Sequence, residues 1–356
     1  MNNNNGFPKK HPLSVQLDLT KFEPLTEDEK RQQDIMSTPT TFFKDGMRKL
    51  FKNPLAVISI IILLLIAVTI IVAPVIVPYK YSEIISVNGV RDKTAKNLAP
   101  FTYSEKEQAY REAGGKVFPH IFGTDAMSRD YFIRVVYGTR VSLLVGLVAS
   151  ALVLVIGLIY GSIAGYVGGK TDLIMMRIVD IIYSLPDMLI IILLSVVLDQ
   201  VLGGLSIGIL SKLGTNLISI FIVFGLLYWV GEARLVRGQI LTIKKNEYVL
   251  AARAIGAKPG RIIRKHILPN CISVIIISTA LQIPSAIFTE SFLSFVGLGV
   301  QAPMPSLGSL ANAAREGLQS FPFKLVFPAL IICLIVLSFN LLGDGLRDAF
   351  DPKLRK

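Results

Sequence analysis

Charged and reactive side chains are scarce in this chain of 356 residues. Aspartate, glutamate, lysine and arginine make up 17% of the sequence, whereas 52% of it is hydrophobic. That balance excludes an ordinary soluble domain and is typical of a protein that crosses a membrane several times. The two cysteines, Cys271 and Cys333, each lie in or beside an apolar run. Their spacing fits neither a metal site nor a disulfide framework, so we expect them to be packing residues.

Histidine is also rare, and no catalytic combination of side chains is visible. The three histidines, His11, His120 and His266, lie far apart in the sequence and form no relay with acidic residues. No apolar run carries a Ser/His/Asp set, an HExxH motif or paired carboxylates. The first such run begins near residue 55 and is too long for a cleavable signal peptide. We therefore expect a non-catalytic membrane protein with no metal site and no cofactor of its own.

The apolar runs predict an all-α polytopic membrane protein with six transmembrane helices. Each run supplies most or all of a helix crossing about 30 Å of hydrocarbon: 55–77, 141–166, 178–198, 217–230, 272–296 and 325–342. Four other segments are predicted: a mobile cytoplasmic tail (1–40), an interfacial helix (41–54), an extracytoplasmic loop (78–140) and a cytoplasmic tail (343–356). A cytoplasmic loop at 240–270 interrupts the five-helix core at 141–342.

The positive-inside rule sets the predicted orientation. Six spans place both termini on one side, and most lysines and arginines outside the long loop 78–140 fall on that side. Long loops carry little weight in this rule, so both termini are expected in the cytoplasm. The net charge of +12 is then explained by topology, and no nucleic-acid partner is expected.

Residues 247–270, EYVLAARAIGAKPGRIIRKHILPN, form a basic segment between two apolar runs. Four residues fall on one face of a short helix: Val249, Ala252, Ile255 and Gly256. Pro259 disfavours helical geometry at Lys258, so a second helix should begin at Pro259. We expect two short helices that present Ala251, Ala252 and Gly256 to a partner outside the membrane. Charge alone would favour a solvated loop.

The second predicted span is rich in glycine. Gly157, Gly161 and Gly165 recur every four residues, which makes a smooth ridge that another helix can approach closely. The following GYVGGKT resembles a phosphate-binding loop, but alanine stands at position 164 where that motif needs glycine. The segment also follows a membrane helix instead of a strand, so we expect this chain to bind no nucleotide.

Ionisable residues within predicted spans are functional candidates. Asp187, beside Pro186 in the third span, and Glu290, in the fifth, are possible cavity or pore residues. Packing explains either residue equally well. Arg177 and Asp180 are spaced as an i,i+3 pair at the cytoplasmic end of the third helix, which favours a structural role.

The basic segment resembles the EAA loop of ABC importer permeases, EAA-x3-G-x9-I-x-LP. Five residues match at the right spacing: Ala251, Ala252, Gly256, Leu268 and Pro269. Leu250 and His266 replace the motif's Glu and Ile, departures that are usual in the peptide-importer branch. Residues 120–142, 290–308 and 339–355, with the FKNPLAV approach to the first span, also resemble C-type subunits of oligopeptide and dipeptide permeases. The first of these segments contains Gly123, Thr124, Asp125, Arg129 and Asp130, with Ser128 where the family usually has glycine.

This resemblance covers most of the chain from Leu50 onward and implies a type I importer fold in a bacterial inner (cytoplasmic) membrane. The loop would be a coupling helix seated on an ATPase subunit through six residues: Ala251, Ala252, Arg253, Gly256, Leu268 and Pro269. ATP and Mg²⁺ would be bound by the ATPases. The implied partners are a second homologous permease as heterodimer, two ATPase subunits, an extracytoplasmic peptide-binding protein and the lipid bilayer. The binding protein would dock on the first outer loop and on residues 301–323.

Two alternatives to a peptide importer remain open from the sequence. C-type sequences look alike, so nickel or another small solute is a possible substrate of the same architecture. A secondary transporter or channel is the alternative from a different class of protein, and it would move solute without any ATPase partner.

Overall fold

The computed structural model describes residues 42–203, 215–300 and 304–350. The chain divides into the units Met1–Asp45 and Gly46–Lys356, and the helical core lies in the second unit. The predicted tail at 1–40 lies outside the described residues. Helix α2 (Phe42–Leu50) falls within the predicted interfacial helix, and Asn53 caps the next helix by accepting hydrogen bonds from Leu55 N and Ala56 N.

Apolar helices long enough to cross a membrane dominate the described part of the chain. Five helical stretches qualify: Pro54–Ile76 (α3), Tyr131–Val167 (α5), Asn216–Ile243 (α9, Thr215–Leu227, with α10, Trp229–Ile243), Pro259–Val296 and Phe323–Phe350 (α15). The fourth contains α12 (Pro259–Ile262), the π-helix η2 (Ile263–Ile267) and α13 (Leu268–Val296). A bent pair, α6 (Gly169–Tyr183) and α7 (Asp187–Gly203), makes six if it counts as one span. The prediction of an all-α membrane protein is confirmed.

The third span differs from its prediction. Instead of one helix at 178–198, α6 and α7 meet at an angle of 85°. The break lies at residues 184–186, and Pro186 accounts for it because proline disfavours helical geometry at the preceding Leu185.

Two further spans are longer than predicted. The fourth does not end near Trp229, because the chain continues as α10 to Ile243, and Trp229 packs in the core with its indole N–H donating to Leu226 O at 2.9 Å. Helix α15 continues to Phe350, so residues 343–350 of the predicted cytoplasmic tail are helical, and their location in the cytoplasm stays a prediction.

The predicted glycine ridge on α5 is confirmed, and its neighbour is α10. A Cβ added at Gly157 would lie 2.6 Å from Glu232 Cβ, and one at Gly161 would lie 2.5 Å from Ala233 O. At Gly165 the added Cβ would lie 3.0 Å from Arg237 O. Only glycine allows this helix pair to approach so closely.

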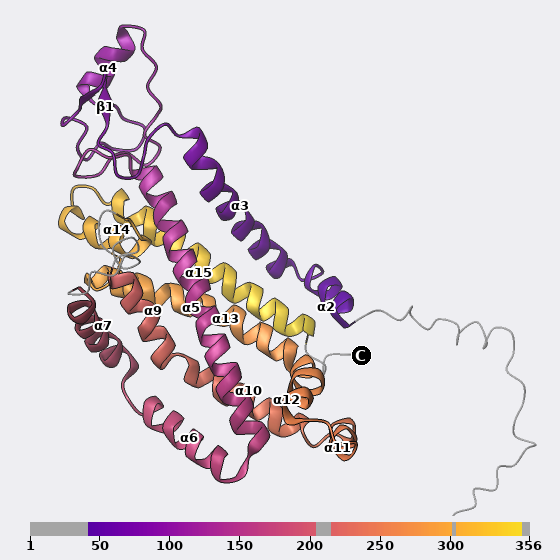
Figure 1. The fold of residues 1–356 in the computed structure, drawn as a ribbon. Helices are drawn as coiled ribbons and strands as arrows, with labels where there is room; N and C mark the ends of the chain where they lie inside the picture. Colours follow the sequence, from indigo (N-terminus) through magenta and orange to yellow (C-terminus); the bar gives the residue numbers. More distant parts are fainter. Residues whose placement is uncertain (1–41, 204–214, 301–303, 351–356) are drawn as a thin grey trace, which may run out of the picture. The chain divides into compact units, whose positions relative to one another are not determined.

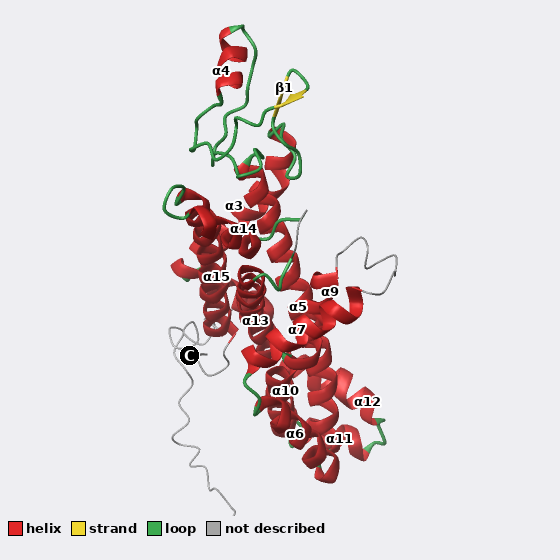
Figure 2. Cartoon of the chain, turned by 90° about the vertical axis from the view of Figure 1, so that its left-hand side faces the viewer, coloured by secondary structure: helices red, strands yellow, loops and turns green. Residues whose placement is uncertain are grey.

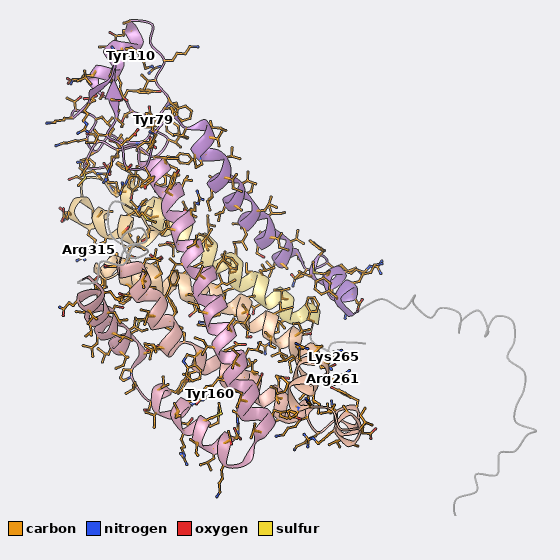
Figure 3. The ribbon with its side chains drawn as sticks, viewed as in Figure 1. Tyr79, Tyr110, Tyr160, Arg261, Lys265 and Arg315 are labelled. Carbon is orange, nitrogen blue, oxygen red and sulfur yellow. The ribbon has the colours of Figure 1, made fainter. Side chains whose placement is uncertain are left out.

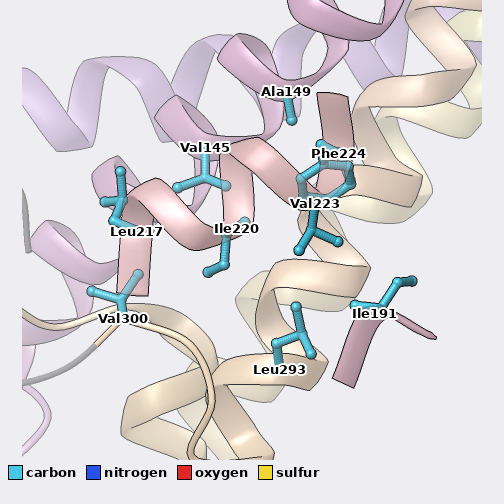
Figure 4. Close-up of a cluster of buried hydrophobic side chains, with 10 residues drawn as sticks. Val145, Ala149, Ile191, Leu217, Ile220, Val223, Phe224, Leu293 and Val300 are labelled. Carbon is cyan, nitrogen blue, oxygen red and sulfur yellow. The ribbon is translucent and has the colours of Figure 1, made fainter. Parts of the chain in front are cut away.

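Buried apolar side chains from several helices form the core. The cluster in Figure 4 joins α5, α7, α9 and α13 through Val145, Ile191, Phe224 and Leu293, among others. Figures 1 and 2 show α4 (Glu105–Glu112) and β1 (Ser86–Val87), which pairs antiparallel with β2 (Val90–Arg91), at one end of the bundle. Helices α6, α11 (Glu247–Ala254) and α12 lie at the other end, and α14 (Leu307–Ala314) with the short 3₁₀ turn η3 (Arg315–Gly317) precedes α15.

Candidate functional site

Residues 247–270, here called the basic loop, form the two short helices that the sequence predicts. Helix α11 ends at Ala254, and Lys258 is extended before Pro259 starts α12. Val249 and Ala252 are buried with Ile240 of α10, Ile262 of α12 and Ile267 of η2, among other apolar side chains. The loop is therefore fixed to the helix bundle by its own apolar face.

Gly256 ends α11 in a Schellman motif. Its φ of +81° is left-handed, Gly256 N donates to Arg253 O at 3.0 Å, and Ala257 N donates to Ala252 O at 3.1 Å. A Cβ at Gly256 would meet no atom within 4 Å, so backbone geometry and not lack of space requires glycine here.

The structure corrects which side chains this loop presents. Ala252 is buried against its own chain, so the interpretation that it faces a partner is wrong. Ile255, predicted on the face of Val249, is 86% exposed because α11 has already ended there. Leu250 is 49% exposed, and Ala251 and Arg253 are exposed beside it. The surface available for contact therefore centres on Leu250, Ala251 and Ile255.

The matched Leu268 and Pro269 lie where the basic loop joins α13. Leu268 N donates to Ile263 O, the i→i−5 bond of the π-helix η2. The wider turn is suited to this position because proline, which lacks an N–H, cannot continue regular α-helical bonding. Leu268 also packs against the buried cluster that holds α11. These two residues position the loop.

Basic side chains line a shallow cavity on the basic loop. Lys258, Arg261, Arg264 and Lys265 surround a volume of about 660 Å³, and Figure 3 labels Arg261 and Lys265 at this end of the bundle. None of the four forms a salt bridge with another described residue. Their positive charge is therefore left to solvent or to another molecule.

Nearby charges on α6 and α10 are paired within the chain. Asp172 accepts from Arg237 Nε at 2.5 Å and from Nη2 at 2.6 Å, and Lys244 Nζ donates to Gly165 O at 2.7 Å. Asp180 pairs with Arg234 at 2.7 Å, so its predicted pairing with Arg177 is wrong.

The second motif, Gly123 to Asp130, lies in residues 79–130, here called the α4 segment. Gly123 has φ +75°, and a Cβ there would lie 2.1 Å from Leu98 O. Thr124 Oγ1 donates to Ala95 O at 2.5 Å and accepts from Leu98 N at 2.8 Å. Ser128, at the position where the family usually has glycine, also has a positive φ of 58°. These residues close a tight turn before α5.

The acidic residues of this motif are buried and bonded. Asp125 Oδ2 lies 2.7 Å from Arg129 Nε and 3.4 Å from Arg134 Nε. Asp130 caps α5 by accepting from Ile133 N at 3.0 Å. The roles visible for this motif are therefore structural.

His120 lies fully buried between two carboxylates. Its Nδ1 lies 2.8 Å from Asp130 Oδ2 and its Nε2 lies 2.9 Å from Glu107 Oε1. Its ring stacks on Tyr79, with 4.9 Å between the ring centroids. Burial alone would lower the pKa of His120, but the hydrogen bonds and charges of Asp130 and Glu107 outweigh it and raise the pKa to about 9. Both ring nitrogens then donate, and the imidazolium joins α4 to the start of α5.

The two acidic candidates in the spans differ. Glu290 is fully buried, and its carboxylate accepts from Ser142 and Ser294, each at 2.8 Å, so the suggestion that it lines a cavity is wrong. Asp187 is exposed in the first turn of α7 and lines a cavity of about 420 Å³ with Tyr183 and Tyr228. Its role in a pore stays a prediction.

One ionisable residue in the core is missing from the sequence-based candidates. Glu232 lies in α10, beyond the end predicted for the fourth span, and its Oε1 accepts from Ser278 Oγ at 2.9 Å. The extended apolar periodicity of 216–243 was the signal that would have placed it in the bundle. Among the described residues, no group of three or more His, Cys, Asp and Glu side chains is arranged to hold a metal ion.

Comparison with known proteins assigns the family. The model of the binding-protein-dependent transport system inner membrane component matches residues 157–356, more than half of the chain. The chain belongs to the ABC importer permeases. A second model, the N-terminal TM domain of oligopeptide transport permease C, matches residues 41–111 of this permease.

Curated relatives match the permease over nearly its whole length. The oligopeptide transport system permease protein OppC of Bacillus subtilis is 40% identical over 335 residues, 94% of this chain and 97% of the relative. The dipeptide transport system permease protein DppC of the same organism is 41% identical over 334 residues, which cover 93% of this chain and 92% of the relative. The inward-facing MetNI methionine ABC transporter aligns with 60% of this chain and 96% of its own, at TM-score 0.45 and 21% identity. This permease is thus a multi-pass membrane protein of the C-type oligopeptide/dipeptide branch, whose members work with other ABC subunits.

Proposed function

We propose that this permease is the C-type transmembrane subunit of an ATP-driven peptide importer. It forms half of the translocation pathway, and its basic loop couples that pathway to cytoplasmic ATPase subunits, which bind ATP and Mg²⁺. The observation that carries the proposal is the 40% identity to an oligopeptide permease over 94% of the chain. The permease itself contributes no catalytic group.

The exposed part of the basic loop supports the coupling role. Leu250 and Ile255 are apolar side chains exposed on a rigid support, because Val249 and Ala252 fix α11 to the bundle. Exposed apolar residues ringed by charge mark protein interaction sites. Closure of the ATPase pair then moves α11, and η2 passes the movement to α13 because the helix is continuous from Pro259 to Val296.

The proposed assembly contains a second homologous permease, as a heterodimer, two ATPase subunits and an extracytoplasmic peptide-binding protein. The membrane is a bacterial inner membrane with both termini of this chain in the cytoplasm. The location of the α4 segment and the basic loop at opposite ends of the bundle supports docking of binding protein and ATPase on opposite sides (Figures 1 and 2). Residues 304–323, around α14, are a further docking surface for the binding protein.

Uptake by proteoliposomes that contain the permease and its co-purified partners tests this function. Tri-alanine should accumulate in the vesicles only when ATP is supplied on the side of the membrane that carries the ATPase subunits and the binding protein is present on the other side. Ni²⁺ should not accumulate. Uptake of Ni²⁺ without peptide uptake would contradict the peptide assignment. Solute movement that persists without any ATPase subunit would contradict an ABC mechanism.

A further inference from the structure

A groove of about 700 Å³ lies along α10, α13 and the last turns of α15. Apolar side chains such as Ile277 and Leu281 form part of its lining. The lining also holds six polar residues: Glu232, Ser273, Ser278, Gln282, Ser285 and Arg347. A groove with one carboxylate, one guanidinium, an amide and several hydroxyl groups is unusual among helices that cross a membrane, where ionisable side chains mark solute pathways.

Glu232 is the buried charge of this groove, and its bonding is incomplete. The residue is 9% exposed, and its Oε1 accepts from Ser278 Oγ at 2.9 Å. Its Oε2 has no hydrogen-bond partner among the described residues, whereas both carboxylate oxygens of Glu290 accept from serines. This oxygen is not among the buried side-chain atoms that lack a partner, so it is open to the groove and can accept from a further donor there.

The backbone on both sides holds Glu232 in place. On α5, Gly157 leaves room for it, because a Cβ there would lie 2.6 Å from Glu232 Cβ and 2.8 Å from Cγ. On α13, Ser278 Oγ fixes one oxygen. The second oxygen is therefore held in a defined position beside the groove.

The other polar groups indicate which ligand fits. Gln282 Nε2 is buried without an acceptor in the described structure, so it suits a carbonyl oxygen. Arg347, on the same lining, suits a carboxylate. No described cluster of acidic, histidine or cysteine side chains around Glu232 could hold a metal ion. An amine, amide carbonyls and a carboxylate together are the groups of a short peptide.

We propose that the Glu232 carboxylate binds the ammonium group of the transported peptide's amino terminus in this groove, an inference that rests on the proposed peptide-import function. Glu232 Oε2 accepts from the ammonium, and Gln282 Nε2 donates to a peptide carbonyl. The site lies along α10 and α13 and includes no residue of the α4 segment, so we assign it to the translocation pathway and not to the docking surface of the binding protein.

Thiol protection tests the site directly. The permease–ATPase complex carries C271A and C333A, so that S285C supplies the thiol in the groove, and its labelling by a neutral maleimide is measured with and without tri-alanine. Tri-alanine should slow labelling, and E232Q should raise the concentration needed for half-maximal protection about tenfold or more, the effect of losing one charged hydrogen bond. N-acetyl-tri-alanine lacks the ammonium group. Its concentration for half-maximal protection should therefore be high, and it should be the same with Glu232 as with E232Q.

The matched control is D344N, which removes an exposed carboxylate of α15 that does not line this groove. It should leave protection by tri-alanine unchanged. Equal protection in the Glu232 and E232Q backgrounds, equal protection by the acetylated peptide, or no protection by tri-alanine would each overturn the proposal.

ATP-driven uptake by the unaltered complex distinguishes failure of the Glu232 site from failure of the proposed peptide-import function. If ATP-driven tri-alanine uptake is absent, the peptide-import function fails. If uptake is present and E232Q gives wild-type protection and wild-type uptake, only the Glu232 site fails. The expected result is tri-alanine uptake about tenfold slower in E232Q, with the ATPase subunits still co-purifying.

Discussion

The α4 segment and the basic loop differ in whether their charged side chains are paired within the chain. In the α4 segment each buried charge meets a partner from the same chain, as His120 does with Glu107 and Asp130. In the basic loop the four basic residues of its cavity form no salt bridge within the described structure, and Ile255 is 86% exposed. The buried charges of the α4 segment therefore need no partner from another subunit. The basic loop exposes the apolar and charged groups that an interface buries, which is why we assign the ATPase contact to it.

Removing His120 should have the largest effect on this comparison. H120A leaves Glu107 and Asp130 buried without their shared cation, and breaking such a buried pair costs about 3–5 kcal/mol. The free energy of unfolding of the α4 segment can be followed by urea titration with a single reporter tryptophan, F118W in a W229F background. ATPase co-purification should be retained, and an unchanged urea midpoint would show that the cluster is not structural.

Alkaline pH should weaken the same segment by a comparable amount. The folded pKa of His120, about 9, lies above its usual value of 6.5, so its contribution is complete below about pH 6.5 and is lost as pH rises through 9. The shift corresponds to about 3 kcal/mol. The urea midpoint of the F118W reporter should fall between pH 7 and pH 10, and this fall should be absent in H120A.

Charging the exposed surface of the basic loop should reduce transport without unfolding the permease. I255D places a carboxylate at the centre of the proposed ATPase contact, and loss of a central interface residue costs about 2 kcal/mol or more, roughly a 30-fold weaker association. ATPase co-purification and ATP-driven tri-alanine uptake measure it. The control, V90D, charges an exposed valine of the α4 segment and should leave ATPase binding intact.

The smallest effect is expected at Gly256. G256A keeps a small side chain that meets no neighbour but strains a backbone held at φ +81°, at a cost of about 1 kcal/mol. Uptake should fall severalfold, and Gly256→Asn, which tolerates left-handed geometry, should retain more activity. Lower activity of the Asn variant than of the Ala variant would instead favour limited space at the interface as the reason for glycine.

The sequence predicted the elements whose signals are local. Continuous apolar runs marked the spans, the Lys258–Pro259 pair predicted the bend in the basic loop, and the four-residue glycine spacing on α5 predicted a close helix partner. The break between α6 and α7 departs from the single span predicted at 178–198, because transmembrane helices tolerate proline and its presence alone does not show where a helix ends. Side-chain direction at helix ends was also missed, as Ala252 and Ile255 show.

The two membrane glutamates show why sites in the bundle are harder to predict. Glu290 is a pore candidate from sequence because it is ionisable and lies in a predicted span, and nothing local indicates its contact with Ser142, 148 residues away. Glu232 lies beyond residue 230, where the continuous apolar run of the fourth span ends, although the helix itself continues to Ile243. Both assignments depend on which helices pack together, and a single sequence does not contain that information.

Crosslinking from position 255 tests the ATPase contact of the basic loop most directly. I255C, in a background with C271A and C333A, would be labelled with benzophenone-4-maleimide and then irradiated, in membranes that contain the whole importer, so that the partner needs no thiol. The predicted result is a covalent adduct with an ATPase subunit that is absent when V90C is used instead. An ATPase adduct from V90C and none from I255C would contradict the assignment of the coupling site to residues 247–270.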